Sequence, residues 1–271
     1  MVTTIIPIYA GGQGIASDGV YRYTNGYTGI WKLSLDWLTS IAYNANAGAQ
    51  TGLVHPHMGG ATYYDGKLYI ACVEMLTQQT DPKSHIGIWD ATDLSFIESI
   101  DISAQGFDAS ACAADPGRNT LWVSSFYSPP PYDVFKYDLT TFEYLGYITL
   151  TPLPTRLLGE VGSHVQGVAY YANKLYFSYS PSGVINGVAG TGVVKTDMTG
   201  SKIKDILPVI FGRCEGQGLF VDSNGGVWVL IDMTDTGAKV VRMYDTPIVE
   251  EYTTVTGGEN QSITLPVGWN V

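Results

Sequence analysis

The feature that most constrains this 271-residue chain is a pattern that recurs five times, at a spacing of about fifty residues. The clearest pair is HMGGATYYDGKLYIA, which starts at His57, and HVQGVAYYANKLYFS, which starts at His164. Looser copies start at Gly11, Gly106 and Glu215. Each copy is followed by a second segment that ends in an acidic turn, such as IGIWDATD or GVVKTDMTG. Repetition at this period predicts one closed repeat architecture rather than two unrelated domains.

Each repeat is a succession of short runs rich in Val, Ile, Tyr, Phe and Trp, separated by turns that contain Gly, Asn, Asp or Pro. This pattern is typical of β-strands, and no long stretch has the 3.6-residue period of a helix. Four antiparallel strands repeated around an axis form a β-propeller. We therefore expect an all-β fold, a single five-bladed β-propeller of four-stranded antiparallel blades over residues 1–271. The expected blades are residues 11–47, 55–104, 105–155, 162–211 and 214–256.

The closure of the ring has two alternatives. IVEEYTTV forms the outer strand of the fifth blade while the terminal segments brace the closure, or one terminal segment supplies a strand across it. A β-sandwich is the rival fold, but it does not explain why the same four runs recur.

Segments such as VAYYANKLYFSYS, followed by VVKTDMTGSKIKDIL, give the chain a resemblance to known repeat proteins. The sequence resembles β-propeller repeats of the YVTN type over roughly residues 11–256. This resemblance implies the propeller fold and carries no particular activity.

Composition excludes several classes of partner. The formal net charge is −11, from 14 Lys and Arg against 25 Asp and Glu, and the chain has no basic run. A nucleic acid and an anionic membrane surface are therefore not expected as partners. No apolar stretch reaches the roughly 20 residues of a membrane helix, and the N-terminus lacks the basic residues of a signal peptide. The three cysteines lack CxxC spacing, so we expect buried thiols at Cys72 and Cys112.

The strand order places the long, variable loops of all blades on one face and the tight turns on the other. The variable loops are residues 75–85, 127–133 and 180–192. Function tends to lie on variable loops held by a rigid scaffold, so this is the expected working face. Aromatic side chains on or beside it suit stacking on sugars or on a protein partner. They are Tyr23, Tyr27, Phe126, Tyr127, Tyr132 and Tyr179, of which Tyr127, Tyr132 and Tyr179 are the predicted ligand-binding residues.

Polar residues recur at the start of the first strand of each repeat, where the channel opens on the working face. Aligned on the QG step, one position holds Gln13, Gly59, Asp108, Gln166 and Gln217. The position two residues earlier holds Gly11, His57, Gly106, His164 and Glu215. Residues two apart on a strand point to the same side, so these side chains are predicted to converge on one axial ring. Gln13, Gln166 and Gln217 are therefore further candidate ligand-binding residues.

Three interpretations of this ring compete. The polar groups satisfy one another as structural filler, for which Gln is well suited. Alternatively, His57, His164 and Glu215, with Asp108 or the nearby His55, bind a divalent metal. The third interpretation is acid–base catalysis, with His57 or His164 as base and Glu215 as acid. Five-bladed glycosidases would supply three carboxylates from their inner strands, whereas Asp108 and Glu215 are the two acids here, which counts against a glycosidase.

The sequence therefore favours a recognition or assembly propeller that binds a glycan or a protein partner through its variable-loop face. Low charge and abundant Gly, Thr, Asn and Tyr favour a virion-surface or extracellular protein over a cytoplasmic one. No cofactor is expected, the alternative being a divalent metal in the central channel. The alternative function is a hydrolase or lyase at the channel mouth, with catalytic candidates His57, His164, Glu215 and Asp108.

Overall fold

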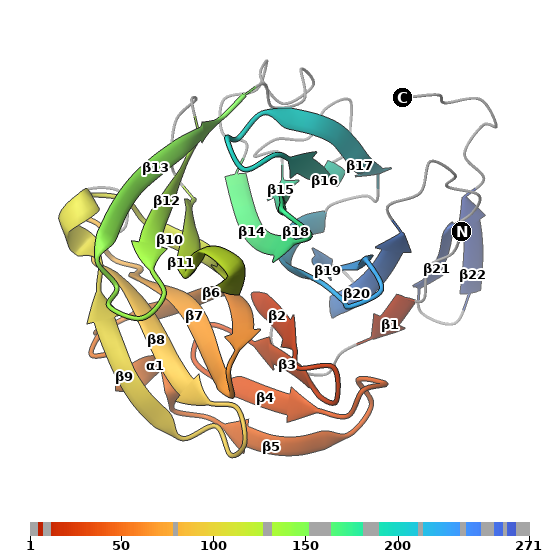
Figure 1. The fold of residues 1–271 in the computed structure, drawn as a ribbon. Coiled ribbons are helices and arrows are strands. Elements are labelled where there is room, and N and C mark those ends of the chain that lie inside the picture. The colour runs from red at the N-terminus through yellow and green to blue at the C-terminus, as the bar shows by residue number, and fades with distance from the viewer. Residues whose placement is uncertain are drawn as a thin grey trace.

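The computed structural model describes residues 5–7, 12–77, 81–126, 132–151, 164–180, 190–210, 214–233, 237–244, 252–256 and 259–263. Antiparallel sheets stand side by side around a central axis, with the first strand of each repeat innermost (Figure 1). The expected all-β propeller with four-stranded antiparallel blades is confirmed. The helical elements of the described chain are single turns, α1 (Ala47–Gln50), η1 (Ser103–Gln105) and η2 (Pro116–Arg118).

Four blades are each built from four strands that are consecutive in the sequence. The first contains β2 (Gly14–Ser17), β3 (Arg22–Asn25), β4 (Ile30–Leu33) and β5 (Ser40–Asn44). The second contains β6 (Pro56–Tyr64), β7 (Lys67–Glu74), β8 (Ser84–Asp90) and β9 (Phe96–Asp101). The third contains β10 (Ala109–Asp115), β11 (Thr120–Ser125), β12 (Tyr132–Asp138) and β13 (Tyr144–Leu150). The fourth contains β14 (His164–Tyr171), β15 (Lys174–Ser180), β16 (Gly190–Thr196) and β17 (Lys202–Ile210).

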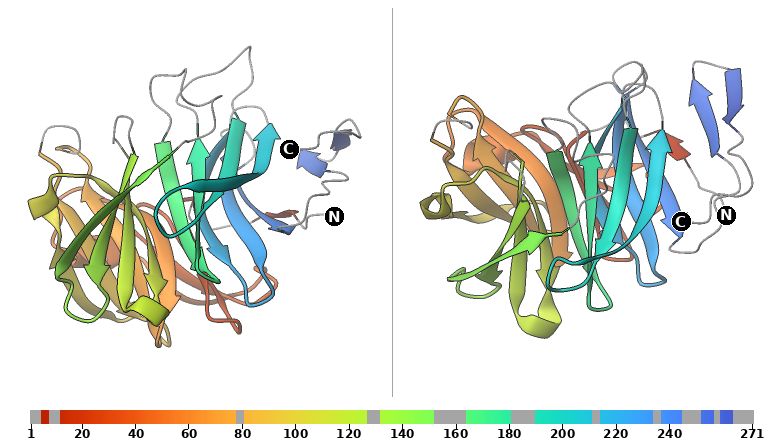
Figure 2. Two further views of the ribbon diagram at one scale, coloured as in Figure 1. Left: turned by 45° about the horizontal axis from the view of Figure 1, so that its top comes forward. Right: turned by 90° about the horizontal axis from the view of Figure 1, so that it is seen from above.

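The last sheet combines segments from the two ends of the described chain. β18 (Cys214–Val221), β19 (Gly226–Met233) and β20 (Gly237–Tyr244) are consecutive, and β1 (Ile5–Pro7) pairs with β20 as the outermost strand. β21 (Tyr252–Thr256) pairs with β22 (Glu259–Ile263) in a separate hairpin beside the sheets (Figure 2). The expectation of five blades of consecutive strands is corrected on this point, because the described residues contain four such blades. The described part of IVEEYTTV lies in β21 and not at the edge of the last sheet. The other alternative for the closure, in which a terminal segment supplies a strand, agrees with the pairing of β1 with β20.

The hydrophobic core lies between neighbouring sheets. Each sheet presents apolar residues on both faces, because each is covered on both sides. Trp122 of the third blade, for example, packs in one cluster with Val168 and Phe177 of the fourth. Cys72 and Cys112 are buried free thiols, as expected.

The tight turns follow the sequence. Asp65 and Gly66 both have positive φ, 48° and 76°, in the turn between β6 and β7. Ala172 and Asn173, with φ of 48° and 61°, occupy the same place between β14 and β15. Two-residue hairpin turns with positive φ match the right-handed twist of the strands, which explains the DG and AN steps of the repeats.

Near the axis the inner strands approach so closely that a Cβ atom has no room. A Cβ added at Gly14 would lie 2.5 Å from the carbonyl oxygen of Gly59 on the next blade. A Cβ added at Gly218 would lie 2.7 Å from the backbone nitrogen of Ile15, so β18 meets β2 in the same way. Real Cβ atoms essentially never come within 3.0 Å of such atoms. The recurring glycine of the repeat is therefore set by backbone packing at the axis.

A cation lies between the first blade and the last sheet. The buried guanidinium of Arg22 is 4.8 Å from the centroid of Trp228 and 5.1 Å from that of Phe220. Trp37, at the turn before β5, contributes a third ring at 5.7 Å. We call this group of Arg22, Trp37, Phe220 and Trp228 the seam cluster. It joins residues of the first blade to β18 and β19, and so holds the beginning and end of the ring together.

Among the described residues, no helix is long and apolar enough to cross a bilayer.

Candidate functional site

The innermost strands carry a local irregularity at the same point. The pairing register shifts between Met58 and Ala61 in β6, and between Val165 and Gly167 in β14. β10 and β18 have equivalent shifts, between Ala109 and Ala111 and between Gly216 and Leu219. Such a β-bulge places an extra, unpaired residue on one strand and redirects the side chain of that residue. Bulges are common next to functional sites.

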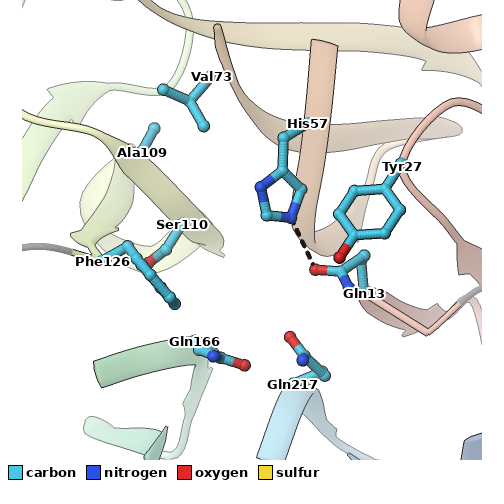
Figure 3. Close-up of a pocket in the computed structure, with 10 residues that line it drawn as sticks. Gln13, Tyr27, His57, Val73, Ala109, Ser110, Phe126, Gln166 and Gln217 are labelled. Carbon is cyan, nitrogen blue, oxygen red and sulfur yellow. Dashed lines mark hydrogen bonds between the residues drawn. The ribbon is translucent and has the colours of Figure 1, made fainter. Parts of the chain in front are cut away.

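The redirected residues meet in one pocket at the axis, with a volume of about 110 Å³ (Figure 3). One residue from each innermost strand, or just before it, lines this pocket: Gln13, Gly59, Ser110, Gln166 and Gln217. The other lining residues are Tyr27, His57, Val73, Ala109 and Phe126. The structure thus brings together His57 and the three glutamines that the sequence placed on an axial ring.

Ser110, which the sequence alignment missed, occupies the ring position that had been given to Asp108. In β10 the register shift leaves Ser110 between Ala109 and Ala111, as Gln166 lies between Val165 and Gly167 in β14. The Ser110 hydroxyl donates to the carbonyl oxygen of Val165 on the next blade, at 2.8 Å. Asp108 belongs two residues earlier, at the position of His57 and His164.

Asp108 is not among the residues that line the pocket. Its side chain is buried, and its Oδ1 accepts hydrogen bonds from the Ser125 hydroxyl at 2.7 Å and the Phe126 backbone N–H at 3.1 Å. The carboxylate therefore secures the end of β11 beside the pocket. The prediction that Asp108 occupies the same position as Gln13, Gln166 and Gln217 on the axial ring is therefore wrong.

His57 is the described imidazole in the pocket. Its Nε2 lies 2.8 Å from Oε1 of Gln13, and its ring packs against Tyr27 with centroids 4.6 Å apart. Burial lowers the pKa of His57 from 6.5 to about 4, so the ring is neutral at pH 7. In Figure 3 the ring stands over the pocket, with Nε2 turned to Gln13.

The aromatic residues expected on or beside the working face divide into two groups. Tyr27 is 51% exposed and Phe126 is partly buried, and both rings line the pocket. Tyr132 and Tyr179 are instead buried in the core between the third and fourth blades, which corrects their predicted role as exposed stacking residues. Both lie on strands, where alternate side chains face the neighbouring blade. Tyr23 is likewise buried in the core, and Tyr127 lies outside the described residues.

The metal hypothesis involves side chains that fall largely outside the described part of the chain. His164 and Glu215 lie on the backbone of β14 and β18 at the position equivalent to His57, but their side chains are not described. Among the described residues, no group of three or more His, Cys, Asp or Glu could hold a metal ion. His55 is exposed and precedes β6. Within the three variable loops, residues 78–80, 127–131 and 181–189 lie outside the described part of the chain.

The described pocket lining is uncharged and combines polar groups with apolar surface. Its polar and aromatic groups are three carboxamides, the hydroxyls of Ser110 and Tyr27, one neutral imidazole and the rings of Tyr27 and Phe126. Such a set can exchange hydrogen bonds in both directions and offer an apolar face, and it holds no carboxylate pair for acid–base chemistry.

Comparison with known proteins gives structural likeness only. No protein-family model matches the chain, and no curated protein matches its sequence. A mutant of the GH43 protein BlXynB from Bacillus licheniformis superposes with a TM-score of 0.60 at 11% identity, over 99% of this chain. The chain spans 60% of the length of that protein. An endo-arabinase from Bacteroides thetaiotaomicron has a TM-score of 0.58 at 15% identity, covering 88% of this chain and 96% of its own. A GH43_1 enzyme from Xanthomonas citri, complexed with xylose, has a TM-score of 0.56 at 11% identity, covering 96% and 94%. These likenesses show the fold.

Proposed function

We propose that this propeller binds a carbohydrate in the axial pocket. The observation that carries the proposal is the lining itself, in which neutral hydrogen-bonding groups surround a small space between two aromatic rings. Sugars present hydroxyl groups that both donate and accept, together with apolar C–H faces that stack on aromatic rings. The GH43 proteins and the endo-arabinase among the fold neighbours support a carbohydrate-related role for the scaffold.

The proposal is tested by glycan-array binding and calorimetry with purified protein. Tyr27→Ala removes an exposed ring from the pocket, and we expect it to weaken binding at least tenfold, since stacking on the sugar and the ring contact that supports His57 are lost together. Tyr147→Ala is the matched control, because Tyr147 is similarly exposed but lies on the outer strand β13. Equal losses in the two variants, or no glycan binding by the wild-type protein, would contradict the proposal. Binding to a protein partner that survives Tyr27→Ala would favour an assembly role instead.

A second candidate function is that of a glycoside hydrolase or lyase acting in the same axial pocket, favoured by the GH43 proteins among the fold neighbours. Hydrolysis of this kind uses two carboxyl groups on either side of the bond. Glu215 is the acidic residue on β18 at the strand position equivalent to that of His57 on β6. Asp108 is the buried acidic residue beside the pocket. Release of reducing sugar from arabinan or xylan, lost in Glu215→Gln and retained in the matched variant Glu98→Gln on the exposed outer strand β9, would establish this function. Inactivity on both polymers, combined with glycan binding, would leave recognition as the role.

The divalent metal at His57, His164 and Glu215 remains a proposal for the hydrolase alternative. Elemental analysis of purified protein tests it directly. One equivalent of a transition metal that disappears in the His57→Ala, His164→Ala double variant would support it, and a metal-free protein with full activity would refute it.

We further propose that the sheet of β18, β19, β20 and β1 acts as the fifth blade. The seam cluster and the contact of Gly218 with Ile15 support this, because they join that sheet to the first blade. The extracellular or virion-surface location rests on composition, and an immunoblot of culture medium, particle and cell fractions would test it.

A further inference from the structure

The orientation of the His57 ring determines which of its nitrogens is available to a ligand. Nε2 lies 2.8 Å from Oε1 of Gln13, and a carboxamide oxygen only accepts hydrogen bonds. Nε2 therefore carries the hydrogen, and in the neutral ring Nδ1 presents a lone pair. Gln13 in turn is held at the entry of β2, where its backbone N–H donates to the carbonyl oxygen of Asn25 at 3.0 Å.

Nδ1 of His57 is buried, and no described protein group donates a hydrogen bond to it. Buried polar atoms in folded proteins nearly always have a partner, so an acceptor of this kind calls for a donor from outside the chain. In Figure 3 the Nδ1 edge faces the side of the pocket formed by Ala109 and Ser110, away from Gln13. His57 is itself one of the residues that line the pocket, so a molecule bound there lies against this ring.

The charged and titratable groups near this point are turned to other partners. Glu74 on β7 accepts the backbone N–H groups of Val54 and His55. Burial alone would raise the pKa of Glu74, but these N–H groups hold it below its ordinary value, so the carboxylate stays ionised and engaged. The Asp108 carboxylate on β10 accepts from Ser125, as described above. The phenol of Tyr27 stands beside the ring.

We propose that Nδ1 of His57 accepts a hydrogen bond from a hydroxyl group of one uncharged sugar unit in the pocket, and that Gln13 is the positioning residue that holds the imidazole in the required tautomer. This inference rests on the proposed carbohydrate-binding function. A pocket of about 110 Å³ is below the usual size for drug-sized ligands, so it suits a single ring rather than an oligosaccharide. A sugar acid is disfavoured, since a carboxylate would face a lone pair and no cation among the described lining residues.

The inference is tested by nitrogen NMR of the ¹⁵N-labelled full chain at pH 7, with D-xylose as the neutral probe and D-glucuronate as the acidic one. We expect the Nε2–H tautomer in the free protein. Saturation with D-xylose should move the Nδ1 signal of His57 in the direction of hydrogen-bond acceptance, and D-glucuronate should not. Gln13→Met should leave a mixture of tautomers and weaken D-xylose binding about tenfold, the scale of one hydrogen bond. Gln217→Met, at the same ring position on β18, should leave the tautomer unchanged.

The outcomes separate this inference from the function on which it rests. An Nδ1–H tautomer in the free protein overturns the inference even if sugars bind. A response of the Gln166 and Gln217 side-chain amides to D-xylose, with the His57 Nδ1 signal unmoved, also overturns it and leaves carbohydrate binding standing. Equal affinity for D-glucuronate refutes the preference for uncharged sugars. The absence of any response to either probe overturns both the inference and the proposed function.

Discussion

The close approach of β18 to β2 predicts that Gly218 cannot be replaced even by alanine without a large loss of stability. In Gly218→Ala, the new Cβ would lie 2.7 Å from the backbone nitrogen of Ile15 and 2.8 Å from Cα of Gly14. Both atoms belong to the backbone of the neighbouring strand, so no change of rotamer can relieve the contact. The two strands must move apart, and this disturbs the pocket and the seam cluster together.

Overpacking a tightly packed site costs about 1–3 kcal/mol, and a backbone-to-backbone contact belongs at the upper end of that range. We expect Gly218→Ala to lower the free energy of unfolding by about 2–3 kcal/mol. For a chain of this size that corresponds to a fall in Tm of about 5 °C. The measurement is urea unfolding followed by tryptophan fluorescence, which reports on Trp37 and Trp228 in the seam cluster.

Gly117→Ala is the matched control. A Cβ at Gly117 would lie 3.5 Å from Oδ1 of Asp115, an ordinary van der Waals distance, on an exposed turn. Its effect should stay within about 0.5 kcal/mol. If Gly218→Ala and Gly117→Ala unfold at the same urea concentration, the reasoning about axial packing is wrong.

Three further predictions concern buried polar groups. Arg22→Met retains the volume of the side chain but removes the cation that lies 4.8 Å from Trp228, so calorimetry should show a loss of about 1–2 kcal/mol; an unchanged Tm would refute the role of the cation. Because burial lowers the pKa of His57 from 6.5 to about 4, the unfolded chain binds a proton in that interval that the folded chain does not. Stability should therefore decrease as the pH falls from 6.5 to 4, by up to about 3 kcal/mol, and His57→Gln should flatten this part of the urea-midpoint profile. Burial raises the pKa of the Cys72 and Cys112 thiols, so a thiol reagent should label neither in the native protein by peptide mapping, and both after unfolding; native labelling would contradict their burial.

The strand pattern and the tight turns could be predicted from the sequence because they depend on local chemistry. Asp65 and Gly66, or Ala172 and Asn173, supply the positive φ of the turns within a window of two residues. The convergence of His57 with the three glutamines could also be predicted from the sequence, since the repeat places these residues near the start of the innermost strand of each blade. These features require only that each blade be like its neighbours.

The alignment of the third repeat could not be predicted in the same way. There Ala111 stands where Gly60 and Gly167 stand in other blades, so the glycine that marks the bulge is missing from the sequence. The helical turn Pro116–Arg118 also lengthens the hairpin that follows. Asp108 was consequently assigned two residues out of register and Ser110 was overlooked. Only the hydrogen-bond register between strands separates these alternatives.

Long-range packing decided the remaining differences. Tyr132 flanks a proline-rich loop in the sequence, yet the strand begins there and its side chain turns into the core. The pairing of β1 with β20 has no local signal at all, because a three-residue edge strand can pair with any exposed partner of suitable length.

That pairing has a consequence for synthesis of the protein. Translation at about 5–20 residues per second leaves Ile5–Pro7 outside the ribosome for tens of seconds before its partner Lys239–Val241 emerges. During this interval the N-terminal strand has no partner within its own chain. Once β20 emerges, the same strand of a neighbouring nascent chain can compete with β1 for pairing with it. Crowded expression should therefore favour dimers that exchange this strand, and slower or more dilute synthesis should favour monomers.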